Sequence, residues 1–159
     1  MLKKEEFKAF AKQHGADLVG IANIERFKDL SKEMHPSSLL PEAKNVIVIG
    51  VRMLRGSLRP IEEGTAWTPY QGFSYGGLNQ MMYRVLWDIS KYLEARGYNA
   101  VPMSADAYWW KGRAKEPGKP APEVCFSPRY AAVAAGLGEI GHSRMFLSPE
   151  FGPRQRLGT

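Results

Sequence analysis

The spacing of apolar residues predicts helices at both ends of the chain and in its middle. Residues 3–14 place Phe7, Phe10 and Ala11 at helical spacing, and Gly15 follows as a stop signal. The longest helix is expected over 78–96, and Gly97 ends it. Its apolar stripe consists of Leu78, Met82, Leu86, Ile89 and Leu93. Shorter helices are expected over 24–33 and 128–135.

Short apolar runs between these helices predict strands over 16–22, 46–51 and 98–102. The run 46–51 is β-branched and apolar on both faces, which is typical of a central strand covered on both sides. Residues 145–147 are expected to be extended, and a further strand is expected near the end of the chain. Strands separated by helices indicate an α/β (α+β) layered domain, and 159 residues suffice for one such domain.

Two long segments, 54–76 and 104–128, are interpreted as irregular loops rich in aromatic residues. The first holds Trp67, Tyr70, Phe73 and Tyr75 among glycines and prolines. Loops of this length are uncommon in compact domains and are usually functional. The aromatic rings either pack as a satellite of the core or form the wall of a flat, largely apolar ligand site.

Composition narrows the function classes. No apolar run reaches the roughly 18–20 residues that span a bilayer, and the start MLKKEEFKAF has no apolar signal-peptide core. We therefore expect a cytoplasmic protein. The net charge of +6 fits a nucleic acid, an anionic ligand or a solvated basic surface, and no nucleic-acid-binding motif is present. The single cysteine, Cys125, excludes an internal disulfide and a cysteine-rich metal site, so no metal ligands are predicted.

The stretch Gly136-Leu-Gly138-Glu-Ile-Gly141 spells the dinucleotide-binding pattern G-x-G-x-x-G. That pattern requires a buried strand before the glycines and a helix after them. Here Ser127-Pro128 reads as a helix start, and four of the seven residues in 129–135 are alanine, so a helix enters the glycines. Gly136 is expected to be the left-handed residue that ends this helix. The pattern therefore does not indicate a Rossmann fold.

Residues 129–158 carry a resemblance to a known family. The stretch contains six features in a fixed order: an arginine, an alanine-rich helix, the three glycines, an apolar triplet, Pro149-Glu-Phe-Gly152 and a basic residue before Leu157-Gly158. This order resembles the epoxyqueuosine reductase and reductive dehalogenase superfamily, whose members are iron–sulfur proteins that use a corrinoid. Less specific likenesses are a strand-like Gly15-Ala-Asp-Leu-Val-Gly-Ile21 and the triplet Ser74-Tyr75-Gly76 ahead of the long helix.

The resemblance implies a nitroreductase-like α/β domain that binds base-off cobalamin, followed in family members by a ferredoxin-like domain with two [4Fe–4S] clusters. Each such cluster takes four cysteine thiolates, and the chain has one cysteine. Residues 1–159 are therefore expected to be a single corrinoid-binding domain, either truncated before the cluster domain or belonging to a protein that has lost it. The resemblance also implies an electron donor such as ferredoxin.

The chain departs from the family pattern at two places. Pro122 and Glu123 stand where epoxyqueuosine reductases have a catalytic aspartate, and Asp106 is the nearest aspartate. After the third glycine, where a lysine or asparagine is often found, the chain has His142-Ser143-Arg144. The resemblance consequently leaves the substrate open.

The candidate catalytic residues are Tyr75, His142 and Asp106, with Tyr75 as a proton donor in a reductive cleavage. The candidate cofactor-binding residues are Tyr70, Phe73, Tyr75, Asn79, Arg129, Gly136, Gly138, Ile140, Gly141, His142 and Ser143. Glycines permit close approach of a ligand and expose backbone amides, and Arg129 is a candidate anion clamp. Three alternatives remain open: a plain helix cap and tight turn at the glycines, a buried Tyr75 with a satisfied hydroxyl, and a structural ion pair at Arg129.

Three functions follow from these expectations. The first is the cobalamin-binding part of an iron–sulfur reductase that acts on a small molecule or a modified nucleoside. The second is a corrinoid- or flavin-binding module of the same fold without its own chemistry. The third is a basic domain that contacts RNA. The expected partners are a small-molecule cofactor and substrate, and a homodimer is possible.

Overall fold

The computed structural model describes residues 2–31, 34–103 and 127–159. Three antiparallel strands form the main sheet, in the order β1-β2-β5. They are β1 (Leu18–Asn23), β2 (Asn45–Arg52) and β5 (Gln155–Gly158). Leu18 lies opposite Gly50 in the first pair, and Gly50 lies opposite Leu157 in the second. The strands predicted at 16–22, at 46–51 and at the end of the chain are confirmed.

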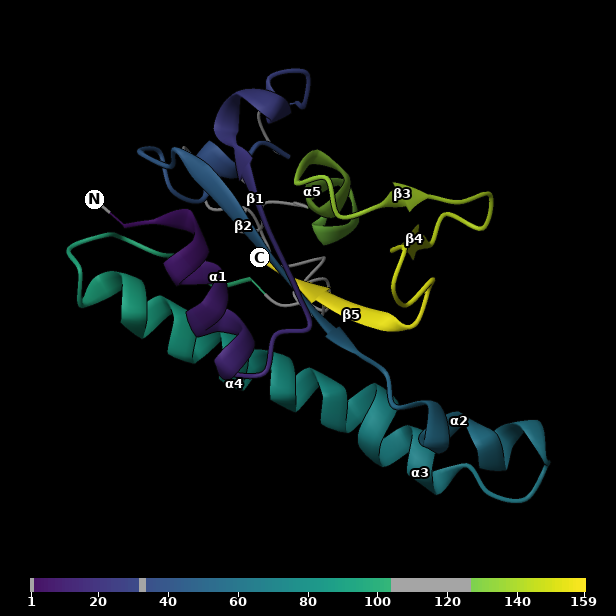
Figure 1. Cartoon of the computed structure of the whole chain (residues 1–159). Helices are drawn as coiled ribbons and strands as arrows, with labels where there is room; N and C mark the ends of the chain where they lie inside the picture. Colours follow the sequence, from purple (N-terminus) through teal and green to yellow (C-terminus); the bar gives the residue numbers. More distant parts are fainter. Residues whose placement is uncertain (1, 32–33, 104–126) are drawn as a thin grey trace, which may run out of the picture.

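Helices cover the two faces of this sheet, so the α/β layered prediction is confirmed (Figure 1). On one face lie α1 (Lys4–Gln13) and the long helix α4 (Gly76–Glu94), and on the other lies α5 (Pro128–Ala134). β2 is central because both of its faces are apolar: Ile49 packs in the α1–α4 core, and Val48 packs in the α5 core. Both side chains are fully buried.

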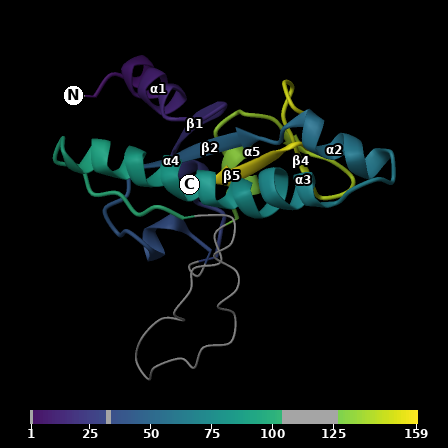
Figure 2. The same ribbon diagram turned by 90° about the horizontal axis from the view of Figure 1, so that it is seen from below.

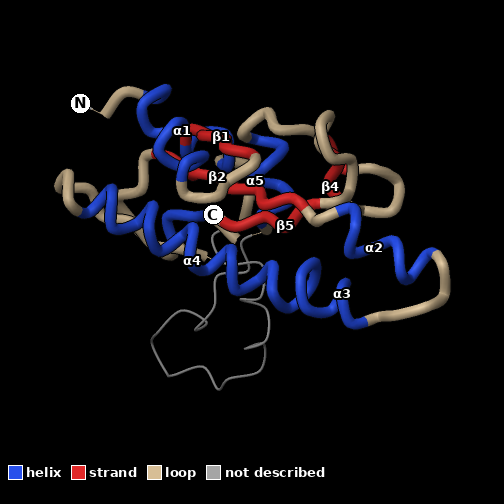
Figure 3. The backbone as a smooth tube through the Cα atoms, turned by 60° about the horizontal axis from the view of Figure 1, so that its bottom comes forward, coloured by secondary structure: helices blue, strands red, loops and turns tan. Residues whose placement is uncertain are grey.

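The prediction of an irregular loop over 54–76 is wrong. The segment forms α2 (Arg55–Glu62), α3 (Thr68–Tyr70) and the π-helical turn η3 (Gln71–Tyr75), which runs directly into α4. Figure 3 shows α2 and α3 side by side at the amino-terminal end of α4. Ser57 in α2 and the buried Ser74 in η3 share a hydroxyl–hydroxyl hydrogen bond, which joins these helices. The aromatic residues of this segment therefore stand on a helical scaffold.

The remaining short elements refine the sequence predictions. The helix expected over 24–33 is a single 3-10 turn, η1 (Ile24–Phe27), and a second such turn, η2 (Pro36–Ser38), precedes β2. The strand predicted at 98–102 is wrong, because no ladder forms there. Only the adjacent Met103 exchanges backbone hydrogen bonds with Thr159, at N···O distances of 2.6 and 2.8 Å. Most of the loop predicted at 104–128 lies outside the described residues.

The glycine motif forms a small hairpin beyond α5, with strands β3 (Glu139–Ile140) and β4 (Phe146–Leu147). A helix precedes the motif, as predicted, and Gly136 takes the left-handed conformation with φ of 73°. Ser127 stands at the start of α5, but its side chain does not cap the helix, and its buried Oγ has no partner within the described residues. Figure 2 shows the sheet and its helices at right angles to the first view.

Candidate functional site

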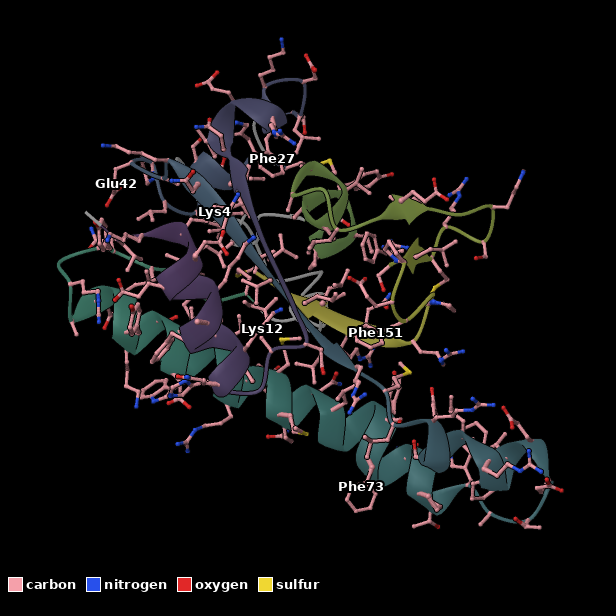
Figure 4. All side chains as sticks on the ribbon, viewed as in Figure 1. Lys4, Lys12, Phe27, Glu42, Phe73 and Phe151 are labelled. Atoms are coloured by element: carbon pink, nitrogen blue, oxygen red, sulfur yellow. The ribbon has the colours of Figure 1, made fainter. Side chains whose placement is uncertain are left out.

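The helical segment 67–75 presents an exposed aromatic surface at the amino-terminal end of α4. Trp67, Phe73 and Tyr75 are exposed by 60%, 65% and 43%. In Figure 4 the labelled Phe73 points away from the body of the protein. The Tyr70 ring lies between its neighbours, with centroids 5.2 Å from Trp67 and 6.2 Å from Tyr75. Large apolar side chains that gather on a surface in this way are typical of a binding site.

A π-helical turn and two glycines place Tyr75 in this surface. The turn occupies Gln71–Tyr75, and Tyr75 itself has φ −117° and ψ −81°, outside the helical region. A Cβ on Gly77 would lie 1.7 Å from the Gly72 carbonyl oxygen, so the turn requires glycine at that position. Single π-helical turns are frequent at functional sites. The wide turn rotates Tyr75 outward at the point where α4 begins.

Arg156 of β5 joins the aromatic surface to the sheet. Its Nε donates a hydrogen bond of 2.8 Å to Oδ1 of Asn79, in the first turns of α4. Its guanidinium carbon lies 4.7 Å from the centroid of the Tyr75 ring, which is a cation–π contact. Asn79 therefore accepts one Arg156 N–H, and the guanidinium retains further N–H donors beside the exposed Tyr75 ring.

The structure thus brings together three of the predicted residues, Tyr70, Tyr75 and Asn79, and adds Arg156, while Phe73 lies exposed on the same turn. Of the open alternatives, a buried Tyr75 with a satisfied hydroxyl is wrong, since the side chain is 43% exposed and its hydroxyl has no partner among the described residues. The sequence analysis noted Arg156 only as a basic residue before Leu157-Gly158. One sequence feature indicated that Arg156 faces away from the core: it alternates along β5 with the buried Gln155 and Leu157.

The second group of predicted residues lies on the other face of the sheet, on α5 and the hairpin that follows it. It consists of Arg129, Gly136, Gly138, Ile140, Gly141, His142 and Ser143. Within the described parts of the chain, no hydrogen bond, ion pair or ring contact links this group to Tyr75 or Asn79. Asp106 lies outside the described residues.

At two of the three motif glycines, other atoms of the protein occupy the space that a side chain would need. A Cβ on Gly138 would lie 2.0 Å from the Leu147 carbonyl oxygen, and one on Gly141 would lie 2.8 Å from Leu147 Cδ1. Gly136 has open space around it and serves as the left-handed residue after α5. The local geometry therefore matches the alternative of a helix cap and tight turn. The cofactor-binding role of these glycines stays a prediction.

Arg129 ties α5 to the hairpin. Its Nη1 donates a hydrogen bond of 2.6 Å to the carbonyl oxygen of Arg144, a residue with φ of 59°. Among the described residues, no carboxylate pairs with Arg129, and the alternative of a structural ion pair at Arg129 stays open. His142 and Ser143 are exposed at the hairpin tip. The role of Arg129 as an anion clamp stays a prediction, and so do the binding roles of His142 and Ser143.

Within the described residues, no helix is long and apolar enough to cross a membrane. No protein-family model matches the chain, and no curated protein matches it. Solved structures do. A selenomethionine-labelled epoxyqueuosine reductase is similar with a TM-score of 0.62 at 18% identity, over 98% of this chain and 44% of that one.

Two further structures extend this likeness. The epoxyqueuosine reductase of Bacillus subtilis, with its catalytic aspartate loop swung out of the active site, has a TM-score of 0.62 at 17% identity, over 98% of this chain and 43% of that one. An epoxyqueuosine reductase with an epoxyqueuosine-modified tRNA stem loop has a TM-score of 0.57 at 20% identity, over 98% and 44%. The chain shares its fold with these proteins and spans less than half of their length.

Proposed function

We propose that this chain is the cofactor-binding part of an iron–sulfur reductase that cleaves a bond reductively on a modified nucleoside or a small molecule. We propose cobalamin as the cofactor. The fold shared with epoxyqueuosine reductases supports the reaction class. The observation that carries the proposal is the contact of Tyr75, Asn79 and Arg156 beside an exposed aromatic surface.

The residues of this site suit a broad, flat ligand in two respects. Exposed rings at Phe73 and Tyr75 offer stacking area to a macrocycle, and the free N–H groups of Arg156 suit its amide oxygens. The glycine turn offers a ligand less room than the sequence suggested, since Leu147 fills the space at Gly138 and Gly141. The fit therefore rests on the aromatic surface and Arg156.

Each residue has a separate role in the proposed reaction. When bound, cobalamin supplies the reducing centre at which the substrate bond is cleaved. The Tyr75 hydroxyl supplies a proton to the departing group, a task that positioned side chains accelerate by roughly 10²–10⁴-fold. Asn79 orients Arg156 through the 2.8 Å hydrogen bond, and Arg156 in turn holds the Tyr75 ring from one side.

The alternative is a non-catalytic corrinoid- or flavin-binding module of the same fold, for which the exposed rings of Phe73 and Tyr75 offer the same stacking surface. Both functions require a chromophore at the aromatic surface. Reductive turnover in a protein that also carries a cluster domain distinguishes the reductase from the module.

An absorbance titration tests the cofactor. We expect the chain to bind cob(II)alamin more tightly than NAD or FAD, and Arg156→Met to weaken that binding at least tenfold, because a hydrogen bond to a charged group contributes about 1.5–3 kcal/mol. Arg84→Met is the matched control, since Arg84 is exposed on α4 and its partner among the described residues is Asp88. Binding of NAD alone, or an equal loss in both variants, would contradict the proposal.

A further inference from the structure

A second candidate site lies between the start of α2 and the turn that joins β4 to β5. Here a shallow hollow is lined by three arginines, Arg52, Arg55 and Arg154. Two links lead from the hollow toward the aromatic surface: Arg154 comes two residues before Arg156, and α2 packs on α3 and η3. None of the three arginines belongs to the site described above.

The ladder between β2 and β5 holds the backbone at two of these arginines, Arg52 and Arg154. The Met53 amide donates to the Arg154 carbonyl oxygen at 2.9 Å, which extends the β2–β5 ladder to the point where α2 begins. The turn before Arg154 is fixed by buried polar groups: Ser148 Oγ donates to Gln155 Oε1 at 3.0 Å, and Gln155 Nε2 donates to the Phe146 carbonyl at 3.0 Å. The arginines therefore stand on a fixed backbone.

The charge of the hollow is positive and largely unpaired. Arg52 pairs with Asp17 at 3.4 Å, with its side chain 57% exposed. Arg55 and Arg154 are exposed, and neither has a carboxylate partner among the described residues. Glu150 is the one carboxylate that lines the hollow. Two guanidinium groups therefore remain available for an anion, and arginine binds phosphate oxygens in a bidentate geometry.

The rest of the lining suits a ligand larger than an inorganic ion. Phe151, labelled in Figure 4 near the start of β5, and Met53 supply apolar surface beside the arginines. At Gly56 a Cβ would meet nothing within 4 Å, so the backbone of α2 is open to close approach. The first turn of α2 has no acidic residue and no side-chain cap, so α2 itself places no carboxylate against an anion, and the carboxylate of the hollow comes from Glu150.

We propose that this hollow binds the phosphate group of a nucleotide, with the guanidinium groups of Arg55 and Arg154 on the phosphate and Phe151 against the nucleoside. The same chemistry is offered by a free nucleotide and by a nucleotide within an RNA chain. The site is independent of corrinoid binding, because it uses none of the residues assigned to the cofactor.

Isothermal titration of the whole chain without corrinoid tests the site, with AMP, adenosine and a short oligoadenylate RNA as the probes. We expect Arg55→Gln/Arg154→Gln to weaken the binding of the phosphate-bearing probes at least tenfold. The control Arg84→Gln/Lys91→Gln removes the same charge from the outer face of α4, where both residues pair with Asp88. Equal melting temperatures of the two variants would show that the fold is intact.

The probes distinguish the two sources of the phosphate. Tight binding of AMP identifies a site for a free nucleotide. Binding of the RNA alone identifies a polynucleotide site, and the double variant then lowers the salt slope by roughly 0.7, since both arginines contact one phosphate and each single-strand phosphate contributes about 0.7. The proposal is overturned if adenosine binds as tightly as AMP, if both double variants lose equally, or if the unmodified chain binds neither AMP nor RNA.

Discussion

Tyr75 is the candidate residue with the most contacts to other members of the site. Its ring centroid lies 6.2 Å from that of Tyr70 and 4.7 Å from the Arg156 guanidinium carbon, and its hydroxyl has no hydrogen-bond partner within the described residues. A phenol in that state is free to donate to a ligand, whereas a core tyrosine would already have its hydroxyl satisfied. The same position therefore supports both ring stacking and proton donation.

We expect Tyr75→Phe to leave the melting temperature and corrinoid affinity nearly unchanged and to lower reductive turnover at least tenfold in a protein that also carries the cluster domain. The phenylalanine keeps the ring contacts and removes only the proton, which is worth roughly 10²–10⁴-fold when a positioned side chain delivers it. Tyr83→Phe is the matched control, because Tyr83 is 45% exposed on the outer face of α4. An unaltered rate would contradict this role and would leave His142 and Asp106 as the candidate proton donors.

At the residue scale, the sequence indicated the aromatic half of the site and missed the arginine. Tyr75 and Asn79 follow from their place at the junction of a glycine-rich segment with a long helix. The sequence alone could not place Arg156 beside these two residues, because that contact depends on the register of β5. In the observed register, Arg156 lies opposite Val51 of β2. Register is a tertiary property that the short run Gln155–Gly158 does not determine.

Among the elements, α2 was missed because its sequence looks unsuited to a helix. It contains Gly56 and Pro60, and Gly64 follows it. Packing on α3 and η3 and the Ser57–Ser74 hydrogen bond supply the stability that intrinsic propensity lacks. The strand predicted at 98–102 failed for the opposite reason. Its apolar residues suit a strand, but Pro102 has no N–H to donate, and Val101 is 43% exposed.

The glycine hairpin gives a prediction about stability. Gly138→Ala should lower the free energy of unfolding by more than about 2 kcal/mol, because its Cβ would lie 2.0 Å from a backbone oxygen that cannot rotate away. Gly56→Ala is the control: its site in α2 is open, and an alanine in a helix is worth roughly 0.5–1 kcal/mol more than a glycine. Urea denaturation of both variants measures the difference. A neutral Gly138→Ala would contradict this expectation and would indicate that the hairpin backbone shifts to make space for the added Cβ.

The layered arrangement of the whole molecule could be predicted from the sequence of one strand. Because 46–51 is apolar on both faces, a cover on each face was required, and the structure supplies α1 with α4 on one face and α5 on the other. The antiparallel direction of both strand pairs was not predicted, since neither pair is joined by a short hairpin turn. Whether a ferredoxin-like domain follows these residues stays a prediction.

The last prediction concerns the whole molecule and the supply of electrons to its cofactor. We expect these 159 residues to bind cobalamin but to show no reductive turnover on an epoxyqueuosine-modified RNA stem loop with ferredoxin as donor. A [4Fe–4S] cluster takes four cysteine thiolates, and the chain has only Cys125, so ferredoxin has no relay to the cofactor.

An artificial chemical reductant bypasses that relay, so it should restore turnover if the residues around Tyr75 are competent. Three assays on one preparation separate the possibilities: ferredoxin alone, artificial reductant alone, and ferredoxin with a cluster domain added. Turnover with ferredoxin alone would contradict the prediction. Cobalamin binding without turnover in any of the three would favour the non-catalytic module, because electrons would then reach a bound cofactor that the protein does not use for chemistry on this RNA.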